Sequence, residues 1–161
     1  MPYETMEALP DTSRVWIYQS NRIFTEAETQ RLHSILQQFA EQWTSHNRAL
    51  RANASLLHDR FIVLLVDESM AGASGCSIDK SVHFMQAIEQ EFGVQLFDRM
   101  NFAYQQGAEI RTAGRDEFVS LYAQGIITDE TIVFDNLVKT KGELASGWQK
   151  PLAESWHARM V

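Results

Sequence analysis

In the first part of the chain, the apolar and polar positions show a strand pattern and then a helical one. Residues 14–19 (Arg-Val-Trp-Ile-Tyr-Gln) are β-branched and aromatic and follow a turn-rich segment, which is typical of a strand. Thr25 followed by Glu28 is the signature of a capping box, and the apolar residues after it recur at helical spacing up to about His46. This pattern predicts a strand and then an amphipathic helix.

The next apolar run is unbroken. Residues 61–66 (Phe-Ile-Val-Leu-Leu-Val) predict a strand that is buried on both faces, and residues 54–57 before it favour a short strand. A run of small residues then ends at Ser77 and Asp79, which are good N-cap residues, and Gly93 is a typical helix stop. We therefore expect two strands followed by a second helix.

Residues 100–105 alternate between apolar and polar side chains, which predicts a further half-buried strand. The resulting order, βαββαβ, is that of ferredoxin-like folds, in which two helices cover one face of a small antiparallel sheet. We predict an α+β core over residues 1–106.

Residues 107–161 predict a C-terminal β-α-β extension that packs on this core as one unit. Its expected elements are a strand at 109–112, a helix at 116–124 and a strand at 131–134. Polar, glycine-containing residues follow, and Pro151 can open a last helical turn.

The composition is that of a globular protein, with 161 residues, 45% hydrophobic and 22% charged side chains. A net charge of -7 without a basic cluster argues against nucleic acid and anionic membranes as partners. Cys76 is the only cysteine, which fits a reducing compartment. The start lacks the pattern of a signal peptide, and no apolar run approaches the roughly 20 residues of a membrane span. We expect a cytoplasmic protein.

Three stretches are similar to one family of small bacterial proteins of unknown function, mostly from the Bacteroidetes. They are residues 13–22 (Ser-Arg-Val-Trp-Ile-Tyr-Gln-Ser-Asn-Arg), 71–79 (Ala-Gly-Ala-Ser-Gly-Cys-Ser-Ile-Asp) and 155–159 (Ser-Trp-His-Ala-Arg). The resemblance covers nearly the whole chain. Members of this family are often labelled ABC transporter ATPases, a label that implies ATP hydrolysis.

The residues do not support that activity. A phosphate-binding P-loop needs the pattern G-x-x-x-x-G-K-[ST]. Gly72 and Gly75 are spaced differently, and Asp79 precedes Lys80-Ser81 where a glycine is required, so its carboxylate would repel phosphates. The Leu-Ser-Gly-Gly-Gln signature is also missing from the sequence. We therefore do not carry the ATPase label over to this chain.

The tail from about Asn101 to Pro151 resembles a GYF-type module, in which an aromatic strand precedes a helix ending in Gly-x-Ile/Leu, then Thr-x-Val and a tryptophan. The matching residues are Phe102, Tyr104, Phe118, Leu121, Gly125-Ile126-Ile127, Thr131-Ile132-Val133 and Trp148. The resemblance implies the fold of these modules. Their Gly-Pro-aromatic step, which belongs to the pocket for proline-rich peptides, is replaced by Ala113-Gly114-Arg115.

The segment from Gly72 to Asp79 carries the most unusual candidate chemistry. Glycines let a backbone approach a ligand, and a helix N-terminus offers unpaired N-H groups. The candidate ligand-binding residues are Gly72, Ser74, Gly75 and Ser77. The alternative is a plain strand-to-helix turn with Ser77 or Asp79 as the N-cap.

The same segment suggests a weak nucleophilic site. The dipole of the following helix would favour the thiolate of Cys76, and a histidine lies about two turns further along. The weak catalytic candidates are Cys76, Ser77, Asp79 and His83. A small buried cysteine is the alternative.

The last residues concentrate aromatic and basic side chains, which are enriched at protein interfaces. The candidate partner-binding residues are Tyr104, Trp148, Trp156, His157 and Arg159. The alternative is that the C-terminal turn folds back and buries its tryptophans on the sheet. None of the five histidines stands in a recognised metal-ligand pattern, and we predict no metal and no cofactor.

These features favour a non-catalytic binding or adaptor protein whose partner is a small molecule or another protein. Two alternatives stay open. One is a small-molecule enzyme that uses the Gly72–Asp79 segment with Cys76 or Ser77, and the other is a homo-oligomeric assembly protein, such as a homodimer.

Overall fold

The computed structural model has an α+β fold of helices and antiparallel sheets, which is the class that the sequence predicts. It describes residues 4–69 and 72–161. The chain forms two compact units. The first contains the residues up to Phe97 together with Lys139–Gly142, and the second contains Asp98–Val138 and Glu143–Val161. The division falls between Phe97 and Asp98, whereas the sequence suggested a core that extends to residue 106.

A three-stranded antiparallel sheet forms the centre of the first unit. Its strands are β1 (Arg14–Gln19), β4 (Arg51–Leu57) and β5 (Phe61–Asp67). The strand order is β1-β5-β4, so β1 and β4 run parallel to each other on either side of β5. Both faces of β5 are buried, as its unbroken apolar run predicts. The short strands β2 (Thr44–Ser45) and β3 (Arg48–Ala49) form a separate hairpin, and a 3-10 turn, η1 (Met6–Ala8), precedes β1.

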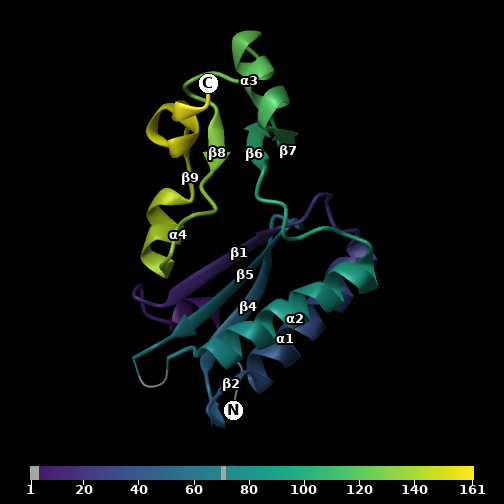
Figure 1. The fold of residues 1–161 in the computed structure, drawn as a ribbon, viewed down its shortest axis with the longest axis vertical. Helices are drawn as coiled ribbons and strands as arrows, with labels where there is room; N and C mark the ends of the chain where they lie inside the picture. The colour runs from purple at the N-terminus through teal and green to yellow at the C-terminus, as the bar shows by residue number, and fades with distance from the viewer. Residues whose placement is uncertain (1–3, 70–71) are drawn as a thin grey trace. The chain divides into compact units, whose positions relative to one another are not determined.

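Two helices, α1 (Glu26–Gln42) and α2 (Gly75–Phe92), lie side by side over one face of this sheet (Figure 1). Thr25 and Glu28 form the predicted capping box of α1, and Gly93 ends α2 in the left-handed conformation with a φ of 64°. Buried side chains of both helices and of alternate β5 positions share one core that includes Leu32, Leu36, Met85, Ile88, Ile62, Leu64 and Val66. These elements are the split βαβ part of the predicted fold.

The last strand of the predicted βαββαβ order belongs to the other unit. This strand, β6 (Asn101–Gln106), pairs with β7 (Glu109–Gly114) through a tight turn at Gly107, which has a φ of 61°. A hairpin between neighbouring segments closes a shorter loop than a return to β1 would, and shorter loops lose less chain entropy. The prediction that this strand completes the first sheet is therefore wrong.

The edge of β1 is paired by a short segment from much later in the chain. Val15 N donates to Lys139 O over 2.9 Å, and Lys141 N donates to Ser13 O over 2.9 Å. Arg14 and Thr140 form an antiparallel bridge between these two bonds. The segment 139–141 thus occupies the place beside β1 that the fourth strand of a ferredoxin-like sheet would take.

The second unit contains a four-stranded antiparallel sheet with the order β7-β6-β8-β9. The helix α3 (Arg115–Ala123) and the strand β8 (Ile132–Phe134) lie where the sequence predicts them. The helix α4 (Lys141–Gly147) and the strand β9 (Gln149–Pro151) were not predicted, because glycines and polar residues interrupt the apolar pattern there. Two 3-10 turns follow, η2 (Leu152–Glu154) and η3 (Trp156–Arg159). None of the described helices is long and apolar enough to span a membrane.

Candidate functional site

The segment from Gly72 to Asp79 is mostly the first turn of α2. The helix begins at Gly75, and its N-cap is Ser74. Ser74 Oγ accepts from Ser77 N over 3.2 Å, while Ser77 Oγ accepts from Ser74 N over 2.7 Å. The expectation that Ser77 or Asp79 caps the helix is therefore wrong, because the two serines satisfy each other's backbone one turn earlier. Ala71, which belongs to the same sequence stretch, lies outside the described residues.

The hydroxyl of Ser77 is used entirely within this cap. It also donates to Ser74 O over 2.8 Å, and the residue is fully buried. The carbonyl of Ser77 accepts from Trp43 Nε1 over 2.8 Å, which ties the start of α2 to the end of α1. These contacts explain the residue by helix capping, and they leave its hydroxyl no free position for a substrate.

A carboxylate already lies beside the glycines that precede α2. Glu68 Oε2 accepts from Ala73 N over 2.9 Å, and a Cβ added to Gly72 would come within 3.1 Å of this same oxygen. The neighbouring Gly75 is exposed and has open space around it. Because Glu68 takes one of the backbone donors and adds negative charge, this turn is poorly suited to a second anion.

Three of the four weak catalytic candidates lie on the surface of α2. Cys76, Asp79 and His83 are exposed, so the alternative of a buried cysteine is wrong. Their spacing of three, four and seven residues places them on one side of the helix. No group of three or more His, Cys, Asp or Glu side chains in the described ranges could hold a metal ion.

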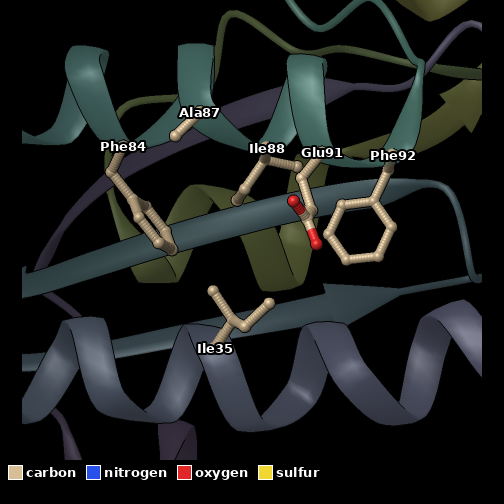
Figure 2. A pocket seen from close by; sticks show the side chains of 6 residues that line it. All are labelled: Ile35, Phe84, Ala87, Ile88, Glu91 and Phe92. Carbon is tan, nitrogen blue, oxygen red and sulfur yellow. The ribbon is translucent and has the colours of Figure 1, made fainter.

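An apolar groove runs between α1 and α2, on the side away from the sheet. Figure 2 shows Ile35 of α1 facing side chains of α2 across this groove. The groove has a volume of about 220 Å³ and is lined by Ile35, Phe84, Ala87, Ile88, Glu91 and Phe92. Ala87 and Glu91 are exposed, whereas Ile88 and Phe92 reach into the core below. We refer to this feature as the α1–α2 groove.

The two ends of the α1–α2 groove differ in chemistry. At one end Phe84 stacks on Phe39, with ring centroids 4.1 Å apart and planes inclined by 5°. At the other end Arg31 forms an ion pair with Glu91, and its guanidinium carbon lies 5.1 Å from the ring centre of Phe92. More than half of each side chain in the Arg31–Glu91 pair is exposed. Such a pair contributes little to stability, so a partner could rearrange it at little cost.

Most of the predicted partner-binding residues of the tail are buried in the second unit. Tyr104 and Trp148 are 5% and 4% exposed, and His157 is 1% exposed. Trp156 is partly buried against the same core, and Arg159 is exposed. The C-terminal turn therefore folds back onto the unit, which is the alternative that the sequence left open. Of this candidate set, Arg159 is exposed, Trp156 is half-buried and the other three residues are buried.

His157 is enclosed by aromatic rings. Its ring stacks on Trp156 with centroids 3.8 Å apart, and it contacts Phe102 and Phe118. Burial lowers the pKa of His157 to about 4, so the imidazole is neutral at physiological pH. Its Nδ1 lies 2.6 Å from Ser155 Oγ. Because both residues of this pair are buried, it stabilises the core and is poorly placed to react with a substrate.

Asp135 organises the end of the second sheet, and no sequence pattern pointed to this residue. Lys150 Nζ lies 2.9 Å from this carboxylate, which also accepts from Trp156 Nε1 over 3.0 Å. Burial opposes ionisation of Asp135, but the hydrogen bonds from Lys150 and Leu137 outweigh it and lower its pKa. In the sequence, a single aspartate within a polar segment looks the same as an ordinary exposed aspartate on the surface.

No family model, curated protein or solved structure matches this chain. The geometry of its own residues is therefore the basis on which a function can be argued. Sequence reasoning missed the α1–α2 groove, although the helical spacing of Phe84, Ile88 and Phe92 was visible. Helical spacing indicates an apolar face on α2, but only the packing of α1 against α2 leaves part of this face open.

Proposed function

We propose that the protein is a non-catalytic binding protein whose α1–α2 groove takes the apolar side chains of an amphipathic helix from a basic partner protein. The observation that carries this proposal is the open apolar groove between two adjacent helices. Packing of an amphipathic helix into a hydrophobic groove is a common mode of peptide recognition.

The size of the groove favours side chains over a small-molecule ligand. Pockets for small molecules and cofactors usually enclose roughly 300–1,000 Å³. The α1–α2 groove is smaller, at about 220 Å³, and its exposed residues Ala87 and Glu91 leave it open along one side. A shallow apolar groove of this kind suits a few side chains presented by a second protein.

The charge of the chain favours a basic partner over a second copy. The net charge is -7, and Glu91 places a carboxylate in the lining of the groove. Two copies would repel each other at long range, whereas a basic helix would be attracted. This argument ranks the homodimer alternative below a complex with a different protein.

The arrangement of reactive side chains gives less support to an enzyme. Ser77 is committed to the helix cap, and the buried Ser155–His157 pair is enclosed. Cys76 is exposed on the helix surface, and its thiol has no hydrogen bond to a base within the described part of the chain. A nucleophile needs an adjacent base or a lowered pKa to react efficiently.

A matched pair of variants tests the proposal. Ala87→Glu places a charge in the groove, and Gln86→Glu makes the same change of charge at the neighbouring exposed residue, outside the lining. The probe is a synthetic helical peptide with leucines at positions i, i+4 and i+7 and lysines on its other faces. We expect this peptide to shift the methyl signals of Ile35 and Ile88 in NMR spectra of the full chain.

The affinity for the peptide should fall at least about tenfold in Ala87→Glu and stay within about twofold in Gln86→Glu. An otherwise identical peptide with glutamates in place of lysines should bind more weakly. Unchanged methyl signals, or equal losses in both variants, would contradict the proposal. A dimer that light scattering detects in the wild type and that Ala87→Glu disrupts would assign the groove to self-association instead.

A further inference from the structure

Arg60 is a buried arginine that forms no ion pair with any of the described residues. It follows the tight turn between β4 and β5, where His58 and Asp59 have φ values of 54° and 52°. The residue is 8% exposed, and its Nε and Nη1 atoms have no hydrogen-bond partner among the described residues. Two buried donors on a charged group are thus left unsatisfied, which is an unfavourable state in a folded protein.

The backbone around Arg60 is well held, so its position is not that of a loose surface loop. Arg60 O accepts from Ser20 N over 2.9 Å, and Arg60 N donates to Leu57 O over 3.1 Å. The preceding residue, Asp59, accepts from Phe24 N over 2.8 Å through its carbonyl. The end of β1 and the start of the α1 segment therefore anchor the turn from which the side chain extends.

Two other arginines of the first unit have acidic hydrogen-bond partners. Arg22 binds Glu28 through two hydrogen bonds of 2.8 and 2.9 Å, and Arg51 binds Asp67 over 2.8 Å. Both are more exposed than Arg60. No ion pair within the described residues involves Arg60, although it is the most buried of the three.

The residues outside the described ranges cannot supply the missing charge. Positions 1–3 are Met, Pro and Tyr, and positions 70–71 are Met and Ala, so none of them is acidic. Burial by itself lowers the pKa of the Arg60 guanidinium, and no carboxylate of the described residues acts in the opposite direction. An arginine nevertheless stays protonated in proteins, so the charge remains in place and needs an anion.

We propose that Arg60 is the centre of a binding site for a small oxyanion, with a carboxylate or phosphate group that accepts hydrogen bonds from its buried guanidinium nitrogens. Planar guanidinium donors match both of these groups, and they bind most strongly where water is excluded. The site is on the β4–β5 turn and does not depend on the α1–α2 groove, so it can be tested separately.

The first experiment follows the Arg60 Nε-Hε signal of the full chain by NMR during titration with sodium phosphate, sodium acetate and, as a control, sodium chloride at equal ionic strength. We expect a saturable shift of this signal with phosphate or with acetate and none with chloride. The salt that shifts it identifies the group that the site takes. No saturable shift with either oxyanion would overturn the proposal and would indicate that ordered water satisfies the guanidinium.

The second experiment compares melting temperatures of the wild type, Arg60→Met and the control variant Arg48→Met, whose arginine is exposed. The effective oxyanion at about 100 times its dissociation constant should raise the melting temperature of the wild type by about 5 °C. Arg48→Met should respond equally, and Arg60→Met should respond no more than it does to chloride. An equal response in Arg60→Met would place the anion elsewhere and overturn the assignment.

Discussion

The two units use their aromatic side chains in opposite ways. In the first unit, Phe39 and Phe84 stack at the end of a groove that stays open to solvent. In the second unit, Phe102, Phe118 and Trp156 surround a buried histidine. The partner-binding candidates of the sequence all fall in the second unit because aromatic and basic side chains gather near the end of the chain. A high density of aromatic residues along the chain is therefore as typical of a core as of an interface. Only the exposure of these residues in the folded protein distinguishes the two.

The largest effect that separates the two aromatic clusters is the loss of a phenyl ring. Phe118 is fully buried, so Phe118→Ala should destabilise the second unit by about 3–5 kcal/mol. Phe84 is partly exposed, so Phe84→Ala should cost the first unit about 1–2 kcal/mol. Amide hydrogen exchange of β6 and of α2 measures the two effects separately. Equal losses, or a larger loss for Phe84→Ala, would refute the distinction between a closed core and an open groove.

The second effect is a pH dependence that His157 should give to the second unit. His157 titrates near 6.5 in the unfolded chain, but burial lowers its pKa to about 4 in the folded protein. The unfolded state therefore binds more protons between these values, and the free energy of unfolding falls as the pH drops from about 6.5 to about 4. The full difference corresponds to about 3 kcal/mol, which is present above pH 6.5 and lost below pH 4.

Amide exchange of β6 at pH 7.0, 5.5 and 4.5, corrected for intrinsic exchange rates, should follow this loss in the wild type. His157→Gln should remove most of the dependence, since glutamine does not titrate. The exposed His33 provides the control, and His33→Gln should leave the dependence unchanged. A similar flattening in both variants would mean that the buried imidazole is not its source.

The smallest expected effect concerns the reactivity of the Cys76 thiol, which distinguishes a binding protein from an enzyme that uses α2. The thiol is exposed, so N-ethylmaleimide should modify it in the native protein at a rate within about threefold of the rate in urea. Mass spectrometry of timed samples gives both rates. A native rate more than about tenfold higher would indicate an activated thiolate and would favour the enzyme alternative over the binding protein.

The elements of this protein were largely predictable from local patterns. Thr25 with Glu28 marked the start of α1, the apolar run at 61–66 marked β5, and Gly93 marked the end of α2. Each of these signals acts within a few residues, through capping, period or backbone conformation. The alternation at 100–105 correctly predicted a strand for the same reason.

The partners of these elements were decided by tertiary structure. The alternation of apolar and polar residues in β6 indicates that one face of the strand is buried, but it does not indicate which sheet the strand joins. The short hairpin with β7 places β6 in the second unit. The sequence by itself determined an α+β protein with two amphipathic helices. Only the packing of distant residues decided that His157 is enclosed and that the apolar face of α2 borders an open groove. It also decided that Arg60 is buried with no carboxylate partner among the described residues. Burial depends on contacts that no local pattern contains.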